Sequence, residues 1–152
     1  AEESDWPPCM RKIIADLANG VNVNHFGRVF LASISAKLAL PEESCIGFFR
    51  GAPDFNESTT TYQVNHVYNG EYTPASCGKL KVNHNCPVLP GDDRLCDISW
   101  MDHPLKYIRA TQRWKAKNQQ VQVNLRKDDE PLSGENQDAN DSEELSENST
   151  IA

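Results

Sequence analysis

The chain has 152 residues, of which 38% are hydrophobic and 24% charged, and its formal net charge is −7 at pH 7. This length suffices for one domain of ordinary size, and no apolar run approaches the roughly 20 residues that a membrane span requires. The negative charge argues against nucleic acid as a partner, because phosphate binding needs a concentrated basic surface.

The acidic residues are concentrated near the C-terminal end. Residues 128–152 contain nine Asp or Glu side chains, no Lys or Arg and no aromatic residue. Such a segment cannot bury enough apolar surface to offset its ordering entropy, so we expect an acidic disordered tail. It either keeps the protein soluble or attracts a basic partner or calcium. Residues 1–127 carry 15 basic and 13 acidic side chains and form the predicted domain.

The first predicted element is a helix over residues 8–19. Its apolar residues recur at helical spacing, at Met10, Ile13, Ile14 and Leu17. Asn19 and Gly20 are typical of a helix end, because both tolerate left-handed backbone angles. Residues 28–40 fit either a helix or a strand, since their apolar positions match both periods. Pro41 ends this element, and residues 42–56 are expected to form an irregular excursion.

From residue 59 onward the pattern favours strands. Residues 59–68 alternate in polarity and are rich in Thr, Val and Tyr, which favour strands. Shorter alternating runs at 79–82, 96–100, 105–114 and 121–125 predict further strands. One helix followed by several antiparallel strands is an α+β arrangement.

Cysteines and glycosylation triplets indicate an oxidising compartment. The chain has five cysteines, of which three follow the spacing Cys77-x8-Cys86-x9-Cys96. Three Asn-x-Ser/Thr triplets, at Asn56, Asn140 and Asn148, predict glycosylation. Together they favour a secreted, extracellular glycoprotein whose signal peptide has been removed.

The order of elements resembles the cystatin superfamily, in particular its multi-cysteine kininogen, fetuin and cathelicidin-type domains. The resemblance rests on the helix ending at Asn19, on residues 30–34 and 62–68, on the three spaced cysteines and on residues 106–114. It implies one helix packed on an antiparallel sheet and a Cys77–Cys86 disulfide, with Trp114 in place of the usual fourth cysteine. The partners of the other three thiols stay open, and one option is a Cys9–Cys45 staple that leaves Cys96 free. The odd cysteine makes disulfide-linked or weak self-association a further option.

The inhibitory wedge of that family is missing, since no Pro-Trp pair occurs and Pro41 to Cys45 stand where its first hairpin tip belongs. The leading function is therefore recognition of an extracellular protein by loops on the scaffold. The predicted contact surface is the 41–58 excursion or the Trp100–Pro104 loop, and its contact residues are Phe48, Phe49, Arg50, Trp100, Met101 and His103. One alternative is a cysteine-protease inhibitor with a diverged wedge. Another is a lipid carrier, because residues 45–51 and 85–88 resemble the MD-2-related lipid-recognition domain; it requires that no helix spans 8–19.

No motif points to catalysis or to a cofactor. The four histidines, His25, His66, His84 and His103, lack the close spacing of zinc ligands. No nucleophile elbow, phosphate-binding glycine loop or HExxH motif is present. We expect no catalytic residue, no metal ligand and no cofactor, and the chain is not expected to be an enzyme.

Overall fold

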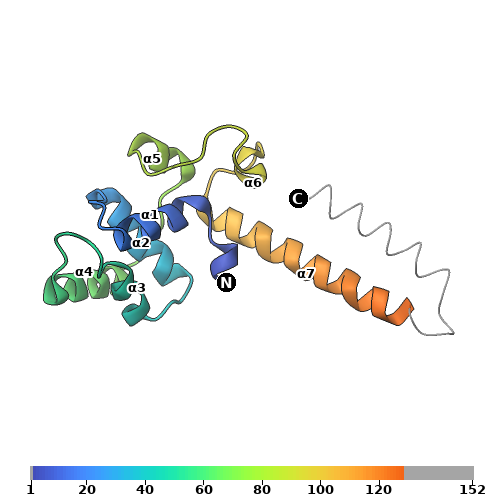
Figure 1. Cartoon of the computed structure of the whole chain (residues 1–152), viewed down its shortest axis with the longest axis horizontal. Coiled ribbons are helices and arrows are strands. Elements are labelled where there is room, and N and C mark those ends of the chain that lie inside the picture. The colour runs from blue at the N-terminus through green and yellow to red at the C-terminus, as the bar shows by residue number, and fades with distance from the viewer. Residues whose placement is uncertain (1, 129–152) are drawn as a thin grey trace. The chain divides into compact units, whose positions relative to one another are not determined.

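The computed structural model describes residues 2–128, and all regular elements in this range are helical (Figure 1). A short 3-10 helix, η1, covers Glu3–Asp5. The α-helices are α1 (Pro8–Ala18), α2 (His25–Lys37), α3 (Glu42–Phe48), α4 (Glu57–Asn69), α5 (Cys77–Val82), α6 (Arg94–Asp97) and α7 (Pro104–Asp128). The chain divides into two compact units, residues 1–107 and 108–152. The described part of the second unit is the continuation of α7.

Polar side chains start four of these helices. Asn24 accepts a hydrogen bond from the Gly27 N–H at 2.8 Å and begins α2. Asn56 does the same for Thr59 at the start of α4, Ser76 caps α5, and Asp93 caps α6. An N-cap side chain replaces one of the hydrogen bonds that the first turn of a helix lacks and contributes about 1 kcal/mol.

Helix α2 is the centre of the first unit, because it contacts α1, α3 and α4 and carries more buried residues than any of them. Its Phe30, Leu31 and Ile34 are at most 2% exposed. The neighbouring helices contribute further buried side chains: Met10, Ile13 and Leu17 from α1, Cys45 and Ile46 from α3, and Val64 and Val67 from α4. Each fully buried side chain of this size contributes about 1.5–3 kcal/mol of transfer free energy, so this cluster is the main source of stability.

The helix predicted over 8–19 is confirmed as α1. Its presence contradicts the lipid-carrier alternative, which required that no helix spans these residues. The ambiguous segment 28–40 is helical to Lys37, and Ala39 turns the chain with a positive φ of 58°. The excursion 42–56 begins with α3.

The α+β, cystatin-like fold is wrong, because no strand occurs in residues 2–128. The segment 59–68, predicted as a strand, belongs to α4. Only Val64 and Val67 are buried there, three residues apart, while Thr59 and Thr61 are exposed. Burial of one helical face thus overrides the strand preference of Thr and Tyr, which is a weak local effect. The strands predicted at 79–82, 105–114 and 121–125 are also wrong, because these segments lie in α5 and α7. The strand predicted at 96–100 is wrong too, because this segment begins in α6.

The predicted boundary between a domain (1–127) and a tail (128–152) stays a prediction. The tail from residue 129 lies outside the described residues, as do Asn140 and Asn148. No helix within residues 2–128 is long and apolar enough to cross a membrane.

Candidate functional site

Cys9, Cys77, Cys86 and Cys96 lie near enough to one another that the charge on one would raise the pKa of another. Cys9 lies in the first turn of α1, Cys77 begins α5, Cys96 lies in α6, and Cys86 lies in the segment between α5 and α6. The pKa of Cys9 is raised to about 12, mainly by burial and further by the charges of the other three thiolates. Burial also raises the pKa of Cys96 to about 12, with added repulsion from Asp93, Cys77 and Cys86. Because the pKa values of Cys9 and Cys96 each include contributions from the others, we group these four thiols under one name, the four-cysteine centre.

The backbone around this centre is fixed by hydrogen bonds. The Cys77 N–H donates to the carbonyl of Asp102 at 2.9 Å, and the Cys96 N–H donates to the Asp93 carboxylate at 3.2 Å. The hydroxyl of Tyr107 donates to the same carboxylate at 2.9 Å. Burial first, and then this carboxylate, raise the pKa of Tyr107, so the hydroxyl keeps its proton and stays a donor. Asp93 thus joins α6 to the start of α7.

All five cysteines are free thiols in the structure, where the resemblance implied a Cys77–Cys86 disulfide. The Cys9–Cys45 staple is not formed either. Cys45 is fully buried in α3, and its pKa is raised to about 11 by burial and, less strongly, by Glu42. It therefore belongs to the helical core and not to the four-cysteine centre.

The arrangement of the four sulfurs restricts what they can hold. Within residues 2–128, no three His, Cys, Asp or Glu side chains converge closely enough for a single metal ion. One zinc ion would draw its thiolates to about 2.3 Å from the metal. Iron–sulfur clusters are held by four Cys thiolates, which is the number of thiols in the four-cysteine centre. The four thiols are thus the donor set of a four-cysteine metal centre, and an iron–sulfur cluster is such a group.

A cavity of about 260 Å³ lies between α2 and α4, and we call it the α2–α4 pocket. Arg28 on its wall is held by three hydrogen bonds, to the Val23 carbonyl (2.7 Å), the Asp54 carboxylate (2.9 Å) and the Asn22 amide (2.9 Å). These use three of the five N–H groups of a guanidinium. The ion pair with Arg28 also lowers the pKa of Asp54. Arg28 is therefore pre-positioned, with donors left for a ligand.

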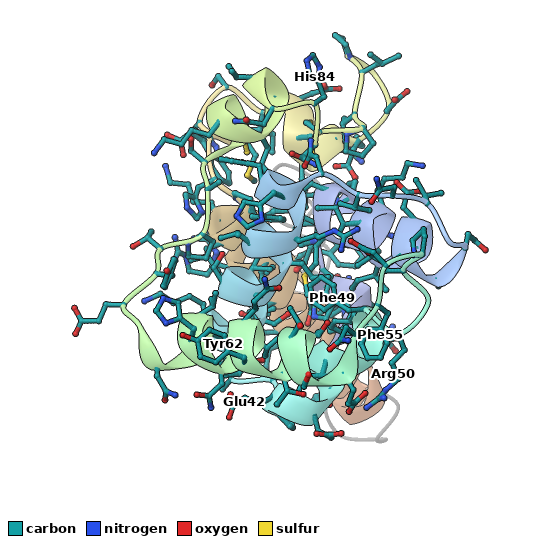
Figure 2. The ribbon with its side chains drawn as sticks, turned by 90° about the vertical axis from the view of Figure 1, so that its left-hand side faces the viewer. Glu42, Phe49, Arg50, Phe55, Tyr62 and His84 are labelled. Carbon is teal, nitrogen blue, oxygen red and sulfur yellow. The ribbon has the colours of Figure 1, made fainter. Side chains whose placement is uncertain are left out.

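Aromatic rings line the same pocket. The rings of Tyr62 and His66 stack with centroids 6.3 Å apart, and Tyr72 meets His66 edge-on at 6.0 Å. Tyr62 is 72% exposed and extends from α4 at the end of the unit opposite to His84 (Figure 2). The Tyr72 ring lies so close to Gly70 that a Cβ there would be 2.7 Å from it. The exposed ring faces and the N–H donors of Arg28 and the histidines suit a planar, anionic ligand.

The six predicted contact residues serve different parts of the unit. Phe49 is buried and lines the α2–α4 pocket, whereas Phe48 packs edge-on against Trp6. Arg50 forms ion pairs with Glu43 and Glu57. Its guanidinium lies over the ring of Phe55, and both residues are labelled in Figure 2. Trp100 is 45% exposed and Met101 is half-buried in the segment before α7, and His103 bonds to the Pro74 carbonyl and the Leu105 N–H. Sequence reasoning missed His25, Arg28, Tyr62, His66 and Tyr72 as a group, because only the fold brings them together.

Comparison with known proteins connects this site to a family. Residues 1–127 match the family model of the C-terminal domain of the large subunit of eukaryotic and archaeal DNA primase. The DNA primase large subunit PriL of Thermoplasma acidophilum is 43% identical over 116 residues, which is 74% of this chain and 34% of that protein. The corresponding subunits of Thermoplasma volcanium (42% over 112 residues; 71% and 34%) and Methanocella arvoryzae (38% over 118 residues; 76% and 31%) are also similar. The chain spans about a third of the length of these relatives. No solved structure matches significantly.

These matches overturn the predictions of a cystatin or MD-2-related domain, of secretion and of an extracellular partner. The inhibitor and lipid-carrier alternatives are wrong with them. The glycoprotein prediction depended on the same reasoning, and Asn56 has a structural use as the N-cap of α4. The exclusion of nucleic acid is also wrong, because net charge averages an acidic end with a balanced domain.

Proposed function

Because the chain belongs to the family of the C-terminal domain of the eukaryotic and archaeal DNA primase large subunit, we propose that it binds nucleic acid for a primase. It acts as a binding domain and catalyses no step itself. Its partners are the remainder of a large subunit, the catalytic subunit of a primase, and the DNA or the newly made primer.

The α2–α4 pocket is the observation that carries this proposal. Single-stranded nucleic acid is bound by aromatic rings on which bases stack, together with basic groups that follow the phosphates. The exposed ring of Tyr62, the ring of Tyr72 and the fixed guanidinium of Arg28 supply both within one cavity. His25 and His66 on the same walls add hydrogen-bonding groups for phosphate or base edges.

The four-cysteine centre has a structural role in this proposal. Helices α5 and α6 have only six and four residues, and α5 contributes Leu80 as its buried residue. Helices this short are unstable in water by themselves. When bound, an iron–sulfur cluster supplies metal–thiolate bonds that contribute to the folding free energy. Cys9 would then tie α1 to α5 and α6, and the segment that connects them would be held at Cys86.

Binding of single-stranded DNA by the metal-loaded protein tests the proposal. We expect Tyr62→Ala to weaken the affinity by about 5- to 150-fold, which corresponds to the loss of one base–aromatic stack of about 1–3 kcal/mol. Trp100→Ala is the matched control, because Trp100 is also an exposed aromatic residue but does not line the pocket. Fluorescence anisotropy with labelled DNA measures both. Equal affinity of the Tyr62→Ala variant and the wild type would refute the assignment of the pocket.

A further inference from the structure

The geometry points to Asn85 as a positioning residue that couples the four-cysteine centre to the α2–α4 pocket. This inference rests on the proposed function. Asn85 is the neighbour of Cys86 in the sequence, and its side chain reaches the first turn of α2. The pocket residues His25 and Arg28 lie on that same turn.

Three hydrogen bonds centre on Asn24 and form the Asn24–Asn85 link. Its side-chain oxygen accepts from the Gly27 N–H at 2.8 Å, as the N-cap of α2, and from the Asn85 side-chain amide at 3.1 Å. Its own amide nitrogen donates to the Asn83 carbonyl at 3.0 Å. Both donor–acceptor roles of the Asn24 amide are therefore used, and the segment before Cys86 is bonded to the helix cap at two points.

The contact between the start of α2 and residues 84–87 is tight at one place and open beside it. A Cβ at Gly27 would lie 2.5 Å from the Asn85 side-chain nitrogen, so the backbone of α2 touches Asn85 there. Next to this contact, a hollow of about 300 Å³ is lined by Asn22 and Asn24 on one side and by residues 84–87 on the other. The Asn24–Asn85 link therefore carries much of the connection on this side.

Residues 83–85 are also held to the end of α5 by backbone hydrogen bonds. The N–H groups of Asn83, His84 and Asn85 donate to the carbonyls of Lys79 (3.1 Å), Lys81 (3.1 Å) and Leu80 (2.8 Å). His84 adopts a positive φ of 63° and lies in the turn after α5 (Figure 2). The Asn85 side-chain oxygen is buried and has no hydrogen-bond partner within residues 2–128. A buried acceptor without a partner is unfavourable, so the position of Asn85 depends on its other bonds, which are the side-chain bond to Asn24 and the backbone bond to the Leu80 carbonyl of α5. Helix α5 begins at Cys77 and the segment ends at Cys86, so a group held by these two thiols would fix both ends of this stretch, and with it the cap of α2.

The consequence for the pocket follows from the next bonds along the chain. Arg28 donates to the carbonyl of Val23, the residue before Asn24. A shift of Asn24 therefore moves both the carbonyl that orients the guanidinium and the helical turn that carries it. Loss of the metal centre, or of the Asn24–Asn85 link alone, displaces Arg28 and His25 from the positions in which they meet a ligand.

The chain offers matched variants for the test. Asn85→Leu removes the donated bond at nearly constant volume. Asn24→Ser keeps a good N-cap but loses the amide nitrogen. Asn83→Ala is the control, because the Asn83 side chain bonds to the Lys79 carbonyl within α5 and only its backbone takes part in the link. All are prepared with iron and sulfide, and iron content and affinity for fluorescein-labelled single-stranded DNA are measured.

We expect Asn85→Leu and Asn24→Ser to keep the iron content of the wild type and to bind DNA about 2- to 10-fold more weakly, which is the range of one intramolecular hydrogen bond. The double variant is expected to bind DNA with the same affinity as whichever single variant binds more weakly, because both substitutions break the same link. Asn83→Ala keeps both properties. Wild-type affinity of Asn85→Leu overturns the inference. The inference is also overturned if the iron content of Asn85→Leu falls by the same factor as its DNA affinity. In that case Asn85 would stabilise the metal centre and have no separate effect on the pocket.

Hydrogen exchange of the amides in residues 24–28 gives a readout that needs no DNA. We expect faster exchange there in loaded Asn85→Leu than in loaded Asn83→Ala, and unchanged exchange would overturn the coupling. If the wild type binds no DNA, the proposed function fails, whereas the exchange result still decides the coupling. If the wild type unfolds completely when iron is removed, the coupling is decided by the exchange rates of the metal-loaded variants.

Discussion

Replacement of Gly51 tests how the segment between α3 and α4 is anchored to α1. A Cβ at Gly51 would lie 2.4 Å from the Leu17 carbonyl oxygen and 3.0 Å from the Ala18 Cα. Both are backbone atoms at the end of α1, so neither can rotate away as a side chain would. The added methyl group must therefore displace the segment or the helix end.

Gly47 in α3 provides the matched comparison, because no neighbouring atom of residues 2–128 lies within 4 Å of the place that its Cβ would take. Overpacking a close contact, as in Gly51→Ala, costs about 1–3 kcal/mol. In a domain of this size each kcal/mol lowers Tm by about 4–8 °C. Gly47→Ala instead relieves the entropy cost of glycine in a helix and is expected to stabilise by about 0.5–1 kcal/mol.

Urea unfolding of the metal-loaded variants, followed by circular dichroism, measures both changes. Gly51→Ala is expected to lower the midpoint and Gly47→Ala to leave it unchanged or raise it. Because Phe49 and Asp54 flank Gly51 and contact the pocket and Arg28, Gly51→Ala should also weaken DNA binding. Identical midpoints for Gly51→Ala and the wild type would show that the segment is not anchored in this way.

Two further predictions concern the thiols. Cys9→Ser is expected to abolish iron binding, measured as iron per chain, whereas Cys45→Ala is expected to retain it. The reason is that Cys45 lies in the helical core, apart from the other four cysteines. Equal iron content in the two variants would contradict the assignment. In metal-free protein, the pKa values of Cys9 and Cys96 are raised from about 9.0 to about 12. The folded state thus favours the protonated thiols, so this stabilisation is fully present below pH 9 and is lost as the pH rises toward 12. Unfolding midpoints that stay constant across this range in the metal-free protein would refute it.

The sequence predicts α1 well and α4 badly, for physical reasons that the two helices illustrate. In α1 the apolar residues Met10, Ile13 and Leu17 follow one face and are all buried. In α4 the buried residues are Val64 and Val67, while Thr and Tyr residues with strand preference occupy exposed positions. The signal that marks α4 is its N-cap, Asn56, which the sequence presents equally well as a glycosylation triplet.

The cysteines are the informative residues of the sequence, but their chemistry depends on the compartment. The glycosylation triplets and the number of cysteines are interpreted as evidence of secretion. In an oxidising compartment cysteines form disulfides, so the sequence predicts disulfides and not metal ligands. The spacing along the chain does not decide the matter, because Cys9 lies far from the other three in sequence. Only the packing of α1 near α5 and α6 brings its thiol within electrostatic reach of theirs.

The α2–α4 pocket and the four-cysteine centre share one structural element, the N-terminal turn of α2. That turn holds Arg28 through the Val23 carbonyl, and its cap residue Asn24 bonds to the segment that ends at Cys86. A cluster that only stabilised the short helices would not need this connection. Because the connection exists, loading of the centre and the geometry of the pocket are expected to change together, and a chain without its metal should be a poor binder even where its core stays folded.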